Sequence, residues 1–129
     1  MIVLTTSYSP EKYHLINEER LRIMKKNSYL INVARGELID EETLAKALQE
    51  NWIAGAALDV MEKEPPSPDN KLLQLDNIVI THHTASHTLE ALENMGDIVT
   101  EDILLALEGR TPKKFGEDHS LMKFNCSCA

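Results

Sequence analysis

One segment, Tyr29–Gly36 (YLINVARG), constrains the fold of this chain more than any other. An apolar and partly β-branched run leads to a small residue, ends at Arg35 and is broken by Gly36. This pattern is typical of a buried parallel strand. Ligands bind at the carboxyl ends of strands in open α/β sheets, so an arginine there is placed to meet an anion. An arginine that simply closes a strand at the surface would give the same pattern, and this segment alone does not separate the two.

Strand-like and helix-like segments alternate along the rest of the chain. Further strands are predicted at Ile2–Thr6, Ile53–Val60 and Ile78–Thr81. Helices are predicted after the capping residues Asn17 and Asp40, and a long helix is predicted to reach about Glu108 and to stop at Gly109. This alternation predicts an α/β fold in which helices cover a parallel sheet.

The two ends of the first predicted helix carry opposite charges. Glu18 and Glu19 lie in its first turn, and Lys25 and Lys26 lie in its predicted last turn, as the helix macrodipole favours. The helix is therefore expected to reach Lys26 and to end at Asn27–Ser28.

The long helix near the end of the chain has one apolar face, made up of Leu92, Met95, Val99, Ile103, Ala106 and Leu107. Gly96 lies within this helix. Two roles stay open from the sequence: close packing of the helix against the sheet, or a contact in a homodimer.

The charge of the chain indicates which classes of macromolecule are unfavourable binding partners. The net charge is −8, and lysines and arginines are scattered rather than clustered, which argues against nucleic acid or an anionic membrane as the partner. No signal peptide and no segment of membrane-spanning length is recognised. The only cysteines, Cys126 and Cys128, lie at the end of the chain, so we expect a reducing, cytoplasmic environment. Because a strand begins at Ile2, we expect a chain that starts partway through a larger fold.

Four chemically active side chains fall at or just after the ends of consecutive predicted strands: Arg35, Asp59, Glu64 and His83. These ends share one edge of a parallel sheet, so the four groups are expected to converge. His83 is suited to proton transfer near neutral pH, and Glu64 could accept a hydrogen bond from its other ring nitrogen. Arg35 could clamp a carboxylate in bidentate fashion.

The motifs INVARG, AGAALDV, EKEP and NIVITHH occur in this order in the chain. In order and spacing they resemble the D-isomer-specific 2-hydroxyacid dehydrogenases, which are NAD(P)-dependent oxidoreductases. The resemblance covers residues 1–112 and implies the C-terminal half of a Rossmann-type NAD(P)-binding domain that lacks the first βαβ unit. Residues 113–129 are expected to form an irregular tail.

The resemblance implies a role for each residue at the strand ends. Arg35 would bind the carboxylate and carbonyl of a small 2-keto or 2-hydroxy acid, His83 would be the acid/base, and Glu64 would pair with it. Asp59 would hold the carboxamide of the nicotinamide of NAD or NADP. The nicotinamide would also be lined by Thr5–Ser7 and by backbone around Val33, Ala34, Arg35, His83, Thr84, Ala85 and Ser86.

The chain departs from the family pattern in several places. His82 stands where the family commonly has proline, and Ala85 and Ser86 replace the usual glycines. The sequence contains no G-x-G-x-x-G turn to hold a pyrophosphate, and no separate substrate-binding domain is recognised.

Three interpretations therefore stay open from the sequence. The chain is an enzyme or a fragment of one, a catalytically silent relative that binds NAD or partner proteins, or a truncated product without an independent role. A metal site is not predicted, because the spacing of the candidate ligands matches no standard zinc pattern; these candidates are His82, His83, His87, Cys126 and Cys128.

Overall fold

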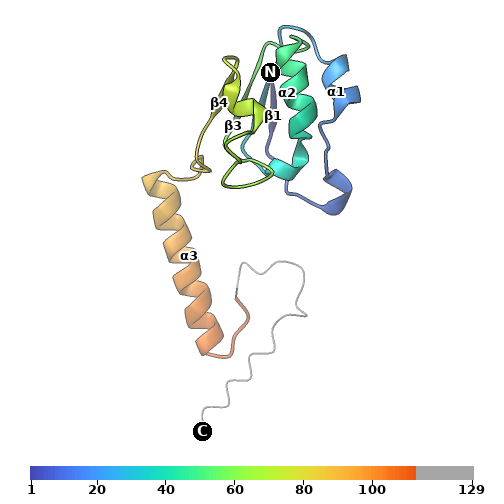
Figure 1. Ribbon diagram of the computed structural model, residues 1–129. Helices are drawn as coiled ribbons and strands as arrows, with labels where there is room; N and C mark the ends of the chain where they lie inside the picture. Colours follow the sequence, from blue (N-terminus) through green and yellow to red (C-terminus); the bar gives the residue numbers. More distant parts are fainter. Residues whose placement is uncertain (113–129) are drawn as a thin grey trace. The chain divides into compact units, whose positions relative to one another are not determined.

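The structure is a computed structural model that describes residues 1–112. Its centre is a sheet of four parallel strands in the order β1-β2-β3-β4 (Figure 1). The strands are β1 (Ile2–Leu4), β2 (Tyr29–Asn32), β3 (Gly55–Leu58) and β4 (Ile78–Ile80). Strand order follows chain order, so every connection leads to the adjacent parallel strand.

Within residues 1–112, three α-helices and three short 3₁₀ turns connect or follow the strands. The helices are α1 (Glu18–Ile23), α2 (Glu41–Gln49) and α3 (Leu89–Leu107). The 3₁₀ turns are η1 (Pro10–Lys12), η2 (Gly36–Leu38) and η3 (Lys71–Gln74). The predicted caps of α1 and α2 are confirmed: the side chain of Asn17 accepts from the backbone N–H of Arg20, and that of Asp40 accepts from the N–H of Thr43.

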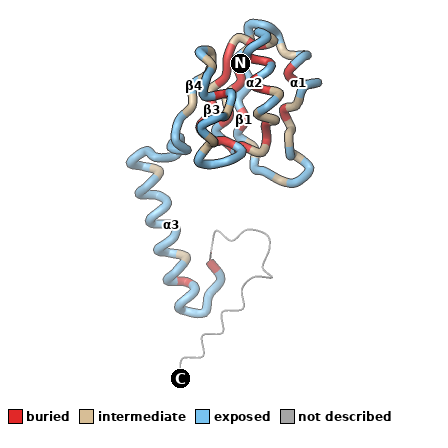
Figure 2. Tube along the Cα trace, viewed as in Figure 1, coloured by how far each residue is buried: buried red, intermediate tan, exposed pale blue. Residues whose placement is uncertain are grey.

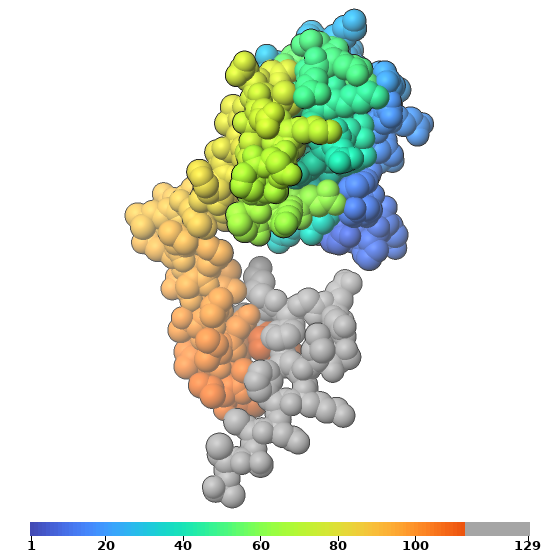
Figure 3. All heavy atoms as spheres, viewed as in Figure 1, coloured from blue at the N-terminus to red at the C-terminus, as the bar shows by residue number. Residues whose placement is uncertain are grey.

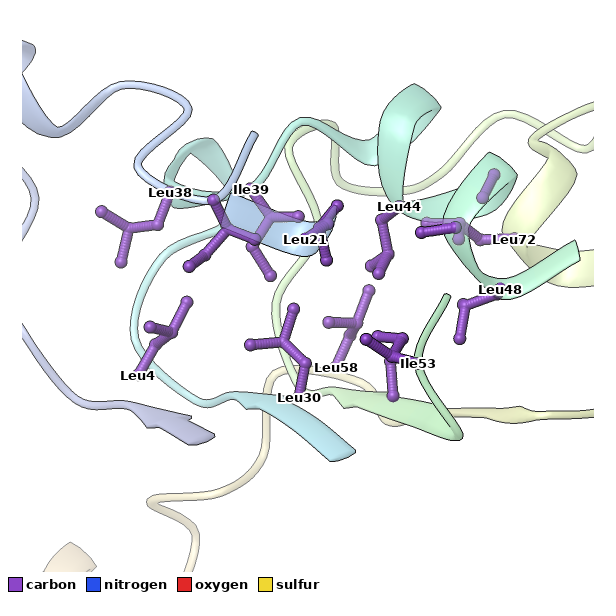
Figure 4. Close-up of a cluster of buried hydrophobic side chains, with 14 of the residues drawn as sticks. Leu4, Leu21, Leu30, Leu38, Ile39, Leu44, Leu48, Ile53, Leu58 and Leu72 are labelled. Atoms are coloured by element: carbon purple, nitrogen blue, oxygen red, sulfur yellow. The ribbon is translucent and has the colours of Figure 1, made fainter. Parts of the chain in front are cut away.

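The hydrophobic core lies between one face of the sheet and α1, α2 and η3 (Figures 2 and 4). Leu30 of the sheet, Leu21 of α1, Leu44 of α2 and Leu72 of η3 are completely buried there. Burial of such side chains is the main favourable contribution to folding, about 1.5–3 kcal/mol each. The chain segments that carry the candidate site are therefore held by a well-packed layer.

The opposite face of the sheet carries a row of apolar side chains. Val3 is paired with Ile31, Ile31 with Ala57, and Ala57 with Val79, so the four residues cross the sheet in register. Val3 and Val79 are 44% and 62% exposed. None of the helices within Met1–Ala85 covers this row.

The first helix is shorter than the sequence predicted. It ends at Ile23, Met24 already has an extended ψ of 150°, and Lys25 and Lys26 lie beyond it. The backbone C=O of Ser28 accepts from the N–H of Ala54 as the chain enters β2. Pairing with the sheet stabilises the chain more than the few tenths of a kcal/mol that lysines add at a helix end.

The strands are also shorter than predicted, and each ends early. β1 ends at Leu4 rather than Thr6, β3 spans Gly55–Leu58 within the predicted Ile53–Val60, and β4 ends at Ile80. Ile53 and Val60 are nevertheless buried, and Ile53 packs in the hydrophobic core without strand pairing. Apolar patterns report burial more directly than they report hydrogen-bonded pairing.

The chain divides into two units, one from Met1 to Ala85 and the other from Ser86 onward. In the second unit, α3 is capped by Thr88 and ends as predicted, with Glu108 as the C-cap and Gly109 at a φ of +72°. Among the described residues, no helix is both long and apolar enough to cross a membrane. The predicted tail, residues 113–129, lies outside the described residues and stays a prediction.

The cap of α2 leads to a stability prediction. Asp40 accepts from the backbone N–H and from the hydroxyl of Thr43, at 3.1 and 2.6 Å. We expect Asp40→Ala to lower the free energy of unfolding by about 1 kcal/mol in urea titrations followed by Trp52 fluorescence. Asp40→Asn keeps an acceptor and should retain most of the stability; equal losses in the two variants would contradict the assigned capping role.

Candidate active site

The carboxyl ends of the four strands lie at one level of the sheet. The last paired residues are Leu4 with Asn32, Asn32 with Leu58, and Leu58 with Ile80. The segments that follow the strands therefore leave the same edge. This is the convergence that the sequence predicted for Arg35, Asp59, Glu64 and His83.

Arg35 is presented by a loop that Asn32 holds from inside the protein. Asn32 is completely buried, its Oδ1 accepts from the N–H of Ala34 at 3.1 Å, and its Nδ2 donates to the C=O of Arg35 at 2.8 Å. These bonds satisfy the polar groups of a buried side chain, and they also fix the backbone conformation of the loop. Sequence reasoning missed Asn32, although a polar residue at the end of an apolar strand was a usable signal.

Gly36 allows the Arg35 loop to lie against the segment that follows β3. A Cβ built on Gly36 would stand 2.0 Å from the carbonyl carbon of Met61 and 2.3 Å from the backbone nitrogen of Glu62. Any larger residue would collide with backbone there. The glycine thus brings the arginine loop beside the loop that carries Glu64.

His83 and Glu64 form a hydrogen-bonded pair at the surface of the first unit, where the Glu64 segment is coloured yellow-green in Figure 3. The Nδ1 of His83 lies 2.9 Å from Oε2 of Glu64, and Oε1 of Glu64 accepts from the N–H of Met61 at 2.9 Å. The side chains are 48% and 39% exposed. With Nδ1 donating to the carboxylate, Nε2 is the ring nitrogen free to exchange a proton with a ligand.

Asp59 is buried just after β3, and its carboxylate accepts three hydrogen bonds from the segment after β4. The donors are the hydroxyl of Thr81 at 2.5 Å and the backbone N–H groups of Thr84 and Ala85 at 2.9 and 2.8 Å. Burial raises the pKa of Asp59, but these bonds more than offset it, so the pKa lies below its ordinary value of 3.8. Asp59 is therefore charged at neutral pH.

Two cavities border these groups. One, of about 260 Å³, has Arg35, Glu64 and His83 in its lining. The other, of about 240 Å³, is lined by Val33, Asp59, Thr84 and Ala85 together with apolar side chains of the bare sheet face. The proton-transfer candidates and the arginine thus share a cavity.

The chain is similar to known dehydrogenases in sequence and in structure. The family model of the NAD-binding domain of D-isomer specific 2-hydroxyacid dehydrogenases matches residues 1–85. The chain belongs to this family.

Individual relatives extend the similarity beyond residue 85. A glyoxylate reductase from Thermofilum pendens is 54% identical over 102 residues, which cover 79% of this chain and 30% of that protein. The chain therefore spans about a third of the length of such relatives.

Two solved dehydrogenase structures confirm the predicted Rossmann-type parallel sheet. An NADPH-dependent glyoxylate/hydroxypyruvate reductase from Sinorhizobium meliloti, in complex with NADP and malonate, superposes with a TM-score of 0.75 at 32% identity, over 81% of this chain and 33% of its own. A D-lactate dehydrogenase from Aquifex aeolicus, complexed with NAD and lactic acid, superposes with a TM-score of 0.76 at 35% identity. The match covers 84% of this chain and 37% of that dehydrogenase chain.

The remaining family-derived assignments fall in different places. Ala34 is buried within the arginine loop, and Ser86 begins the second unit. The contact of either residue with nicotinamide stays a prediction. Among residues 1–112, no group of three or more histidine, cysteine, aspartate or glutamate side chains is arranged to hold a metal ion. Cys126 and Cys128 lie outside the described residues.

The hydrogen bonds of Glu64 lead to a prediction about how stability depends on pH. The hydrogen bond from His83, and then that from the N–H of Met61, hold the pKa of Glu64 below its ordinary value of 4.5. A lowered pKa in the folded state means that Glu64 stabilises the fold fully above pH 4.5 and loses this contribution as pH falls below it. The pKa of Asp59 is also lowered, so Asp59 likewise loses its stabilising contribution as the pH falls below 3.8.

We therefore expect the midpoint temperature of thermal unfolding to decrease as the pH is lowered from 6 to 3. The decrease should be less steep in Glu64→Gln. Circular dichroism melts across this range measure both slopes. Equal slopes in the two proteins would show that Glu64 does not contribute to the acid sensitivity.

Proposed function

We propose that this chain supplies the nicotinamide-side half of an NAD(P)-dependent oxidoreductase site that acts on a small D-2-hydroxy acid or 2-keto acid. The observation that carries the proposal is the His83–Glu64 pair at 2.9 Å beside Arg35 in one cavity. An acid/base and a carboxylate-binding cation around one space are the groups that interconversion of a hydroxyl and a carbonyl requires.

His83 serves as the acid/base in this proposal. Its Nδ1 donates to Glu64, so Nε2 delivers the proton to the carbonyl oxygen during reduction and removes it during oxidation. Glu64 keeps the imidazole in one orientation. Glu64 is itself held by the N–H of Met61 at 2.9 Å, so the pair is anchored to backbone.

Arg35 binds the carboxylate of the substrate. A guanidinium group offers parallel N–H donors that match a carboxylate, and it polarises a carbonyl beside it. In the structure Arg35 donates one bond to the C=O of Ala34 at 2.7 Å, which leaves other donors for a ligand. Malonate, a dicarboxylate, is bound by the Sinorhizobium meliloti relative, in keeping with an anionic ligand here.

The cavity at Asp59 fits the nicotinamide end of a dinucleotide. Ile31, Ala57 and Val79 of the apolar row line this cavity. Among the described residues, Oδ2 of Asp59 accepts only the bond from Ala85, so it keeps a lone pair for a carboxamide N–H. When bound, the nicotinamide supplies or accepts the hydride. Relatives are complexed with NADP and with NAD, and either cofactor is consistent with this end of the site.

The proposal is tested on the purified chain. NADH and NADPH are titrated by fluorescence, and their oxidation is then assayed with glyoxylate, hydroxypyruvate and pyruvate. Binding with turnover supports the proposal. Binding without turnover would assign the chain to the silent, NAD-binding class. A folded sample with neither binding nor turnover would leave the chain without an independent dehydrogenase role.

A further inference from the structure

The carboxylate of Asp59 lies at the centre of the turn that carries His83. Its three donors come from both sides of that residue: the Thr81 hydroxyl before it, and the N–H groups of Thr84 and Ala85 after it. Successive backbone N–H groups that converge on one anion form a recognised anion-binding concavity. Here the anion is a side chain of the protein itself.

Both partners in this arrangement are anchored to the sheet. The N–H of Asp59 donates to the C=O of Asn32 at 2.9 Å, and the N–H of Thr81 donates to the C=O of Leu58 at 2.9 Å. Asp59 is 6% exposed, so its bonds are largely protected from competition with water. The turn is therefore attached to β3 through the carboxylate as well as through β4.

The backbone of His83 has a conformation that needs such support. Its φ is +58°, in the left-handed region that residues other than glycine rarely adopt. Conformations of this kind persist where the surroundings over-determine them. The three bonds to Asp59 enclose His83, and they provide that constraint.

We propose that Asp59 and Thr81 are positioning residues for His83, because they hold its turn in the one conformation that brings the imidazole to Glu64. The lowered pKa of Asp59 accords with this arrangement, since a charged carboxylate accepts all three bonds. The consequence for catalysis rests on the proposed function, whereas the positioning itself needs neither cofactor nor substrate.

The test uses the full chain and isosteric variants at Thr81. Thr81→Val removes the hydroxyl and keeps the shape, and Thr81→Ser restores the hydroxyl. Thr43→Val is the matched control, because it deletes a Thr–Asp hydrogen bond of the same kind, 2.6 Å long, at the cap of α2. Asp59→Asn is a second variant, in which an amide N–H₂ must face a backbone N–H.

The readout is the long-range ¹H–¹⁵N spectrum of the imidazole rings, together with the carboxyl ¹³C titration of Glu64. In the wild type, Thr81→Ser and Thr43→Val, we expect the hydrogen-bonded Nδ1–H signal of His83 and a Glu64 pKa below 4.5. In Thr81→Val and Asp59→Asn we expect loss of that signal and a return of the Glu64 pKa toward 4.5.

Two results would overturn the proposal. One is an unchanged His83 signal in folded Thr81→Val; the other is loss of the signal in Thr43→Val, which would mark a general effect of lowered stability. A wild-type chain that shows the His83 signal but binds no NADH would refute the proposed function and leave the positioning role intact.

Discussion

Gly36→Ala is expected to lower the free energy of unfolding of the first unit by about 3 kcal/mol or more. This is a large share of the free energy of unfolding of a typical domain, which is about 5–15 kcal/mol. The new methyl group would stand 2.0 and 2.1 Å from the carbonyl carbon and oxygen of Met61. Both atoms belong to backbone, so no side-chain rotation relieves the collision. Urea unfolding followed by Trp52, the only tryptophan, measures the loss.

Two other glycines provide graded controls for this prediction. A Cβ at Gly55 would meet the carbonyl oxygen of Asn77 at 2.9 Å and the ring of Tyr29 at 3.1 Å, so Gly55→Ala should cost less. Within the described residues, a Cβ at Gly96 meets nothing inside 4 Å, and Gly96→Ala should leave the Trp52 transition unchanged. A Gly36→Ala chain as stable as Gly96→Ala would contradict the close approach to Met61.

His83→Ala is expected to lower kcat by about 10²–10⁴-fold in a preparation that oxidises NADH with a 2-keto acid. This is the usual contribution of a positioned acid/base. Because the imidazole is 48% exposed, its removal leaves no large cavity, and the unfolding midpoint should change little. Steady-state kinetics and a urea titration of the same preparation separate the two effects.

His87→Ala is the matched control for His83→Ala. His87 is also exposed and lies in the segment just before α3, outside the proposed machinery, so the variant should keep wild-type kcat. Glu64→Gln retains an acceptor oxygen but removes the charge, and we expect it to lie between the wild type and His83→Ala. Equal activity in His83→Ala and the wild type would remove His83 from the reaction.

Much of the sheet and the main contacts of the candidate site follow from local patterns in the sequence. Arg35 and Glu64 were placed by counting strand ends, and this works because parallel strands all finish at one edge. The Asn17 and Asp40 caps were found because a cap is decided within four residues. Helix α1 was predicted too long because charge at its end is a weak signal compared with the pairing of the next strand.

The features that the sequence did not reveal depend on neighbours distant in the chain. Asn32 resembles any polar residue at the end of a strand until its bonds to Ala34 and Arg35 are seen. Thr81 is one more β-branched strand residue until Asp59 lies beside it. Gly36 was recognised as the end of a strand, but the approach of Met61, which makes it irreplaceable, comes from a loop much later in the sequence.

The row Val3, Ile31, Ala57 and Val79 affects how preparations of this chain are judged. A folded protein that presents aliphatic side chains across an open sheet should bind fluorescent dyes such as ANS in its native state. Bright dye emission from a freshly purified sample would then report this surface rather than a molten globule. A cooperative thermal transition in a sample that already binds the dye at low temperature would indicate the native fold, because a molten globule lacks fixed tertiary packing.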